Sequence, residues 1–190
     1  MIEQIKIGCA STKTTYGHRL DTTLVELNSD AKISGLFTSN KFKSAPVQIC
    51  LDQFEAKMKG KKMLAINAGN ANAATGKKGV SDAKKLIKEI SNLTNISTTQ
   101  ILPFSTGVVG QLLDMKELSS AFNKCFKNLS KNSWDDFAKA IMTTDTKSKI
   151  IKLPFKAGSK KYHIIGIAKG VGMIEPNMAT TLSYVFTDLK

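Results

Sequence analysis

The residues best suited to chemistry lie in four loops, and the last of these loops ends in a threonine. Residues 169–182 form a glycine-rich turn followed by a proline, after which Ala179 precedes Thr180 and an apolar strand pattern begins. An N-terminal threonine at a strand start presents its hydroxyl beside an α-amine, and an amine with a pKa of about 8 is a usable general base. Because Thr180 is internal, this amine would exist only after cleavage of the Ala179–Thr180 bond. An isolated Ala-Thr pair would carry no such meaning.

Three further loops carry polar groups that could serve the same reaction. In residues 105–110, the hydroxyl of Thr106 and the N–H of Gly107 could point two donors at one developing oxyanion, each worth up to roughly 4 kcal/mol in a preorganised site. Residues 142–146 hold three hydroxyls and a carboxylate, which could bind the polar ends of an amino acid or simply end a helix. Residues 67–76 combine three asparagines with two glycines, which permits left-handed backbone. Each of these loops, taken alone, is more often a structural turn.

The segments between these loops alternate between strand-like and helix-like patterns. Apolar alternation or short apolar runs predict strands at residues 20–27, 31–37, 62–66, 100–104, 150–155, 162–168 and 180–187. Capping residues before amphipathic segments predict helices that begin near Ser44, Ser81, Asp114 and Ser133. No internal repeat or linker stands out, so the alternation predicts one α/β domain.

The composition is that of a folded protein without an evident membrane or secretion signal. Hydrophobic residues make up 42% and charged residues 23% of the 190 residues, which allows one substantial core. The N-terminus lacks the apolar run of a signal peptide, and no stretch approaches the roughly 18 apolar residues of a membrane span. Cys9, Cys50 and Cys125 are scattered along the chain, so we expect reduced thiols in a cytoplasmic protein and no metal site.

The net charge of +13 is the one unusual bulk property. Such a charge could indicate a polyanion such as nucleic acid as the partner. However, Arg19 is the only arginine among the 28 basic residues, and guanidinium groups are preferred for reading bases and gripping phosphates. The lysines are also spread along the whole chain. We therefore expect a solvated lysine surface, partly balanced by a further piece of the protein, and no nucleic-acid partner.

Taken together, the sequence and order of the four loops resemble the ornithine acetyltransferase family, also called bifunctional glutamate N-acetyltransferases, of the cyclic arginine pathway. The most specific part of the resemblance is the Pro-Asn-Met-Ala-Thr block of residues 176–180 together with the Ser-Thr-Gly sequence of residues 105–107. The matching segments span almost the whole chain: residues 37–42, 45–47, 67–76, 105–110, 140–146 and 169–182. The resemblance implies an α/β, self-processing, N-terminal-nucleophile-like architecture, of which only the front half is present.

The resemblance also implies a mechanism. The family precursor cuts itself at the position of Ala179 and Thr180, so the Thr180 hydroxyl is expected to attack the Ala179 carbonyl and form an ester that water resolves. The freed Thr180 then takes the acetyl group from N-acetylornithine and passes it to glutamate in a ping-pong scheme, with Thr106 and Gly107 holding the oxyanion. No metal or cofactor is implied, and the use of acetyl-CoA as a second acetyl donor stays open.

By the same resemblance, Thr143 and Lys169 are expected to contact the substrate, with Lys169 pairing with a carboxylate. Thr144 and Thr146 stay open as alternatives to Thr143. Family precursors are about twice as long, so we expect residues 1–179 to form an α-chain-like domain and residues 180–190 to be the start of a truncated β chain. The family implies a C-terminal β chain that supplies further binding residues, and a heterotetramer of two α and two β chains. The strand begun at Thr180 would then lack a partner, and the chain alone could be inactive.

Two alternatives stay open at this point. The first is a related self-processing aminopeptidase or amidohydrolase that uses the same nucleophile, and hydrolysis of peptide amides without transfer to glutamate would favour it. The second is a basic binding module without enzymatic activity. Affinity for a polyanion that falls steeply with salt would favour this second alternative.

Overall fold

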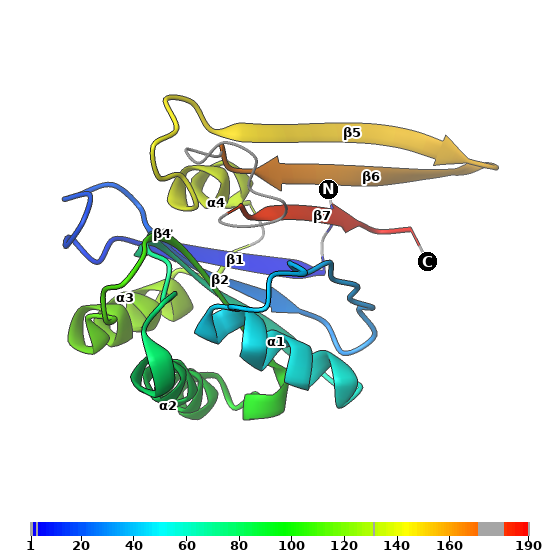
Figure 1. Cartoon of the computed structure of the whole chain (residues 1–190). Coiled ribbons are helices and arrows are strands. Elements are labelled where there is room, and N and C mark those ends of the chain that lie inside the picture. Colours follow the sequence, from blue (N-terminus) through cyan, green and yellow to red (C-terminus); the bar gives the residue numbers. More distant parts are fainter. Residues whose placement is uncertain (1, 3, 131, 171–180, 190) are drawn as a thin grey trace.

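The computed structural model describes residues 2, 4–130, 132–170 and 181–189, which form two β-sheets packed face to face (Figure 1). The first sheet has the strand order β1-β2-β3-β4. Strands β1, β2 and β3 pair antiparallel, and β4 joins β3 in parallel. Because both faces of this sheet are covered, β3 is buried along nearly its whole length. The strands are β1 (Ile5–Ala10), β2 (Thr22–Leu27), β3 (Lys62–Asn70) and β4 (Ile101–Val108).

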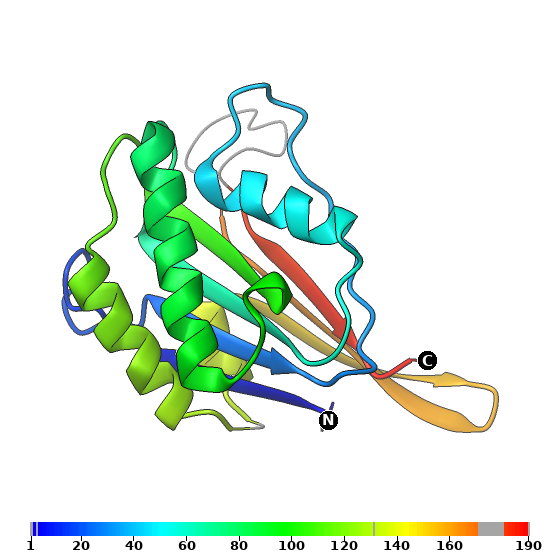
Figure 2. The ribbon, with the colours of Figure 1, turned by 90° about the horizontal axis from the view of Figure 1, so that it is seen from below.

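Helices cover one face of the first sheet, as Figures 1 and 2 show. They are α1 (Ala45–Glu55), α2 (Gly76–Thr94) and α3 (Met115–Lys127), and a 3-10 helix, η1 (Thr98–Gln100), leads into β4. The apolar side of α2 packs on the sheet as its periodicity predicts. The start of α3 is confirmed, because the side chain of Asp114 accepts a hydrogen bond from the Glu117 N–H at 3.1 Å. No helix in the described ranges is long and apolar enough to cross a membrane.

The opposite face of the first sheet is covered by α4 (Trp134–Ala140) and by the second sheet (Figure 1). The second sheet has the antiparallel order β5-β6-β7, with β5 (Lys149–Ala157), β6 (Lys160–Ala168) and β7 (Ser183–Thr187). The strands predicted at residues 150–155 and 162–168 are therefore confirmed, and they pair as a hairpin. The expectation that the last strand would lack a partner is wrong, because β7 pairs with β6 over its full length.

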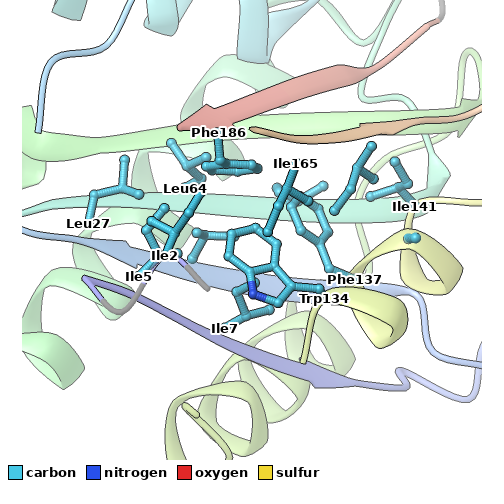
Figure 3. Close-up of a cluster of buried hydrophobic side chains, with 14 of the residues drawn as sticks. Ile2, Ile5, Ile7, Leu27, Leu64, Trp134, Phe137, Ile141, Ile165 and Phe186 are labelled. Atoms are coloured by element: carbon cyan, nitrogen blue, oxygen red, sulfur yellow. The ribbon is translucent and has the colours of Figure 1, made fainter. Parts of the chain in front are cut away.

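An aromatic cluster fills the space between the two sheets (Figure 3). The rings of Trp134 and Phe137 lie 5.2 and 6.1 Å from the ring of Phe186 in β7. Tyr184 of β7 contacts Phe104 of β4, with ring centroids 5.5 Å apart. The apolar face predicted for the last strand is therefore confirmed, and it holds β7 against both α4 and the first sheet.

Two predictions in the N-terminal part of the chain need correction. Residues 31–37 were expected to form a strand but are irregular: Ala31, Ile33 and Phe37 pack half-buried against the core without strand pairing, and Leu36 is 87% exposed. Strand β1 was not predicted, because Gly8, Cys9 and Ala10 give it a weak apolar signal. The small residue at position 8 has a packing reason, since α3 lies directly against it.

Three boundaries also differ from the prediction. Helix α2 begins at Gly76 instead of Ser81, because the side chain of Asn72 accepts from the Thr75 hydroxyl at 2.8 Å and donates to a carbonyl in the first turn at 3.0 Å. Residues 105–107 were expected in a loop but belong to β4. Strand β7 begins at Ser183, and the predicted strand start at Thr180 lies outside the described residues.

The contact of α3 with β1 at Gly8 yields a stability prediction. A Cβ at position 8 would lie 1.9 Å from the carbonyl oxygen of Cys125. We expect Gly8→Ala to lower the free energy of unfolding by about 3 kcal/mol, because a backbone carbonyl in a helix cannot move aside. The control Lys6→Ala, on the same face of β1, should cost less than about 1 kcal/mol, since Lys6 is exposed and loses only an ion pair with Glu26. Chemical denaturation measures both, and equal losses would contradict this packing.

Candidate active site

The ends of β3 and β4 bring two glycine backbones into direct contact. Gly69 lies opposite Gly107 in the parallel pairing of these strands. A Cβ on Gly107 would lie 2.3 Å from the carbonyl carbon of Gly69, and the φ of Gly107 is +131°. Both facts exclude other side chains at this position. The backbone around Gly107 is thus fixed by its neighbour.

Thr106 carries a buried hydroxyl without a hydrogen-bond partner among the described residues. The residue is only 1% exposed. Side chains alternate along a strand, so Thr106 points to the same side of β4 as Phe104, toward the second sheet. The ring of Phe104 contacts Tyr184 of β7, which places this face of β4 against β7. Burying an unpaired hydroxyl costs about 1–3 kcal/mol, so the position suits a donor that awaits a ligand.

The asparagine-rich segment 67–76 is held together by its own side chains. Asn67 accepts from the hydroxyl of Ser105 at 2.6 Å and donates to the carbonyl of Asn70 at 2.9 Å. Asn70 in turn donates to the carbonyls of Gln111 and Leu112. In the described contacts these asparagines therefore fix the turn that follows β3, next to the end of β4.

Lys169 lies at the end of β6, next to the segment that contains the predicted nucleophile. Its N–H donates to the carbonyl of Leu182 at 3.1 Å and so continues the β6–β7 pairing. The residue is 6% exposed, and its Nζ donates to the carbonyl of Gly170 at 2.7 Å. Burial lowers the pKa of Lys169. Ala179 and Thr180, the predicted cleavage site, lie outside the described residues.

A buried carboxylate, Asp145, joins the Thr143 loop to the end of β6. Its side chain is 1% exposed. One oxygen accepts from the Thr143 N–H at 3.2 Å, and the other accepts from the Gly170 N–H and, at 2.5 Å, from Nζ of Lys149. Burial alone would raise the pKa of Asp145, but these hydrogen bonds outweigh burial and hold the pKa below its ordinary value. The structure thus brings together the two segments that carry the predicted substrate-binding residues.

Arg19 holds the same loop from its other side. Its guanidinium donates to the carbonyl of Met142 at 2.8 Å and to the carbonyl of Thr143 at 3.3 Å, and it stacks 3.7 Å above the ring of Tyr16. No site role was predicted for Arg19, and Asp145 was considered only as one member of the polar segment 142–146 that could bind an amino acid. One sequence signal could have drawn attention to these residues: Arg19 is the only arginine, and Asp145 is the only carboxylate within residues 142–146.

The Thr106–Gly107 strand end and the Thr143–Lys169 cluster are connected through the loop between β1 and β2. Ala68, which lies opposite Thr106, donates its N–H to the carbonyl of Asp21 at 2.7 Å. Arg19, two residues before Asp21, binds the Thr143 loop. The described contacts therefore link the two groups through this loop and do not join Thr106 directly to Thr143 or Lys169.

The cysteines are poor candidates for catalysis. Burial raises the pKa of Cys9 and Cys50 to about 12, and it raises the pKa of Cys125 well above its ordinary value. All three are free thiols, as predicted, and little reactive thiolate exists at neutral pH. Within the part of the chain that the structure describes, no three His, Cys, Asp or Glu side chains group as a metal site.

Comparison with known proteins places these features in a family. The model of the ArgJ family matches residues 4–190. The arginine biosynthesis bifunctional protein ArgJ of Colwellia psychrerythraea is 39% identical over 98% of this chain and 46% of its own length. That of Methylococcus capsulatus is 36% identical over 100% of this chain and 46% of its own length. The chain thus spans about half the length of the curated relatives it matches.

Solved structures agree with the family match. The crystal structure of ArgJ from Bacillus halodurans aligns with a TM-score of 0.79 and 27% identity over 93% of this chain and 92% of that chain. Ornithine acetyltransferase of Mycobacterium tuberculosis, solved with ornithine, gives a TM-score of 0.75 and 25% identity over 91% of each chain. These likenesses confirm the predicted α/β class, with part of an N-terminal-nucleophile-like fold. The chain belongs to the ArgJ family.

Proposed function

We propose that this chain is the front part of an enzyme that transfers the acetyl group of N-acetylornithine to glutamate through an acetyl ester on Thr180. The family match, the names of the relatives and the ornithine-bound solved structure support this role in arginine biosynthesis. The observation that carries the proposal is the buried hydroxyl of Thr106, unpartnered among the described residues and next to Gly107, on the face of β4 that packs against β7.

Processing is proposed to occur between Ala179 and Thr180. The Thr180 hydroxyl attacks the Ala179 carbonyl, its proton passes to the nitrogen of the broken amide, and water then hydrolyses the ester. The products are a carboxylate on Ala179 and a free α-amine on Thr180. Chain lengths support a cut near this position, because the two solved chains are matched over 92% and 91% of their length and the curated relatives over only 46%.

The freed Thr180 would then act as nucleophile with its own amine as the general base. The hydroxyl attacks the acetyl carbonyl, the amine takes the hydroxyl proton, and the Thr106 hydroxyl and the Gly107 N–H stabilise the oxyanion. Ornithine leaves with that proton, and the amine of glutamate attacks the acetyl ester. All bond-making groups come from the chain and its substrates, so the scheme calls for no cofactor, and acetyl-CoA stays open as a second donor.

Lys169 and Thr143 are proposed to hold the substrate. An ammonium group in a partly desolvated position pairs more strongly with a substrate carboxylate than one in water does, and Lys169 is such a group. Thr143 is favoured over Thr144 and Thr146, because it is half-buried and its backbone is fixed by Asp145, whereas the other two threonines are exposed.

The outer face of the second sheet supports a further part of the proposal, the association with a second chain. Ile151, Leu153 and Val185 point away from the core and are 53%, 49% and 74% exposed. They form one apolar patch on the same face of the sheet. Ile151 of β5 and Val185 of β7 lie on either side of Gly166 of β6, and Leu153 lies two residues after Ile151 in β5. Helices cover the outer face of the first sheet, but the described residues provide no such layer for the second. Exposed apolar patches of this kind mark interaction sites.

We propose that the occupant of this patch is a segment from the half of the family's length that this chain does not span. The curated relatives are about twice as long as the matched region. The exposed Lys160 lies on the same face as the patch, at the hairpin turn, and the chain carries a net charge of +13, so an apolar element with acidic margins fits. Pairs of such two-chain units would give the heterotetramer that the family resemblance implies.

The nucleophile can be tested with adjacent threonines. Thr180→Ala should abolish both self-cleavage and acetyl transfer, because the attacking hydroxyl is lost. Thr181→Ala, which removes the neighbouring hydroxyl, should leave both nearly unchanged. The chain is produced together with the second half of the precursor, cleavage is followed on a denaturing gel, and transfer from N-acetylornithine to glutamate is assayed. Active wild-type protein with residues 179 and 180 still joined would contradict the proposal.

The oxyanion role of Thr106 predicts a crossed pattern of stability and rate. Thr106→Val should slow cleavage and kcat by about 100-fold or more, with little loss of stability, because the hydroxyl has no described partner to lose. Ser105→Ala on the opposite face should cost about 1 kcal/mol of stability through the lost bond to Asn67, with kcat nearly unchanged. Thermal unfolding and steady-state kinetics measure both effects. The same pattern in both variants would exclude a specific role for Thr106.

Charged substitutions in the proposed docking patch should weaken the association of the two chains. Leu153→Lys and Val185→Lys should each weaken binding of a separately produced second chain by at least about tenfold, because each buries a charge in the interface. Leu36→Lys alters an apolar side chain that is also exposed, at 87%, but lies in the irregular segment 31–40, and it should have no effect. Sedimentation analysis gives the dissociation constants. Self-association of the 190-residue chain that the same variants abolish would identify a second copy as the occupant and refute the proposal.

A further inference from the structure

Asp145 is unusual among the carboxylates because it is buried in a loop and both of its oxygens bind backbone. The side chain is 1% exposed, and its oxygens accept from the backbone N–H groups of Thr143 and Gly170. Thr143 is two residues away in the sequence, but Gly170 is 25 residues away, at the end of β6. Hydrogen bonds to an ionised carboxylate are about twice as strong as neutral ones. Asp145 therefore holds two segments of the backbone together, one at Thr143 and one at Gly170.

Gly170 is shaped for this contact. A Cβ at position 170 would lie 2.5 Å from the Asp145 carboxylate and 3.3 Å from Nζ of Lys149. Gly170 does not have a positive φ, so backbone conformation does not require a glycine here. The close approach of the Asp145 carboxylate does. The chain thus leaves out a side chain at the point where the carboxylate meets the end of β6.

The ion pair with Lys149 does not account for this arrangement. Lys149 is 51% exposed, and an ion pair with one partner so exposed contributes little to stability. The two backbone bonds, by contrast, determine where the flanking residues lie. One flanking residue is Thr143, whose carbonyl Arg19 holds from the other side, and the other is Lys169, directly before Gly170.

We propose that Asp145 is a positioning residue of the acetyl-transfer site, which fixes the spacing between Thr143 and Lys169 so that both contact one substrate molecule. This inference rests on the proposed function. Asp145 also sustains the positive charge of Lys169. Burial and Lys149 lower the pKa of Lys169, and Asp145 opposes them, so loss of the carboxylate would deprotonate Lys169 at a lower pH. Arg19 and Tyr16 are the other ionisable groups near Asp145.

A first experiment needs no enzymatic activity. In NMR spectra of the 190-residue chain, Asp145→Asn should move the Gly170 amide proton upfield and measurably lower the pKa of the Lys169 ammonium, because the carboxylate that raises this pKa is lost. Asp135→Asn is the matched control, because it removes a carboxylate that is 61% exposed and pairs with Lys152, and it should change neither signal. Unchanged Gly170 and Lys169 signals in Asp145→Asn would overturn the inference.

A second experiment uses the enzyme assembled with its second chain. Asp145→Asn should raise the KM for N-acetylornithine about tenfold and change kcat by less than about threefold, because the substrate contact is displaced but the nucleophile is not. Gly170→Ala forces the same contact apart from the other side and should do the same. The double variant should be no worse than the worse single variant. Additive losses, or a loss confined to kcat, would overturn the inference.

The two experiments separate the possible failures. If the wild-type assembly transfers no acetyl group, the proposed function fails, and the substrate role of Asp145 fails with it. The NMR result would still decide whether Asp145 holds Gly170 and supports the charge of Lys169. If the wild-type enzyme is active but Asp145→Asn matches Asp135→Asn in KM, only the positioning role is lost.

Discussion

The packing of Tyr184 and Phe186 between the two sheets is the interaction on which the candidate site depends. Strand β7 has only five residues and pairs on one side, with β6. Its position over the first sheet comes from its rings, with Tyr184 against Phe104 and Phe186 against Trp134. Full burial of a side chain such as that of Phe186 is worth about 1.5–3 kcal/mol, and half-buried Tyr184 adds to it. This burial fixes β7 relative to β4, the strand that carries Thr106.

The elements that were predictable are those whose pattern and local chemistry agree. The cap of Asp114 on α3 and the hairpin of β5 and β6 depend on residues close in sequence. Strand β1 could not be predicted, because its signal is weakened by Gly8, which is required by a helix more than a hundred residues away in sequence. The pattern of residues 31–37 is strand-like, but no neighbouring strand pairs with it.

The candidate site divides in the same way. Thr106 and Gly107 were identified from their residue types. Whether the Thr106 hydroxyl and the Gly107 N–H are exposed or buried, however, depends on the pairing of β4 with β3. Asp145 appeared in the sequence only as one polar residue among hydroxyls. Its proposed role depends on a hydrogen bond from Gly170, and no local pattern predicts which distant backbone N–H a carboxylate will meet.

The contrast between Asp145 and Thr106 indicates how the chain uses its buried polar groups. Several other buried polar atoms also lack a partner among the described residues, but their circumstances differ. Those of Arg19, Gln53, Asp82 and Gln100 belong to side chains that hydrogen-bond through another atom, and Trp134 and Tyr184 fill the core with their rings. Thr106 has a single polar group, and valine would fill the same space without the roughly 1–3 kcal/mol cost of an unpaired hydroxyl. Stability alone gives no reason for that hydroxyl, so its place between two fixed strand ends supports the proposed contact with a substrate oxygen.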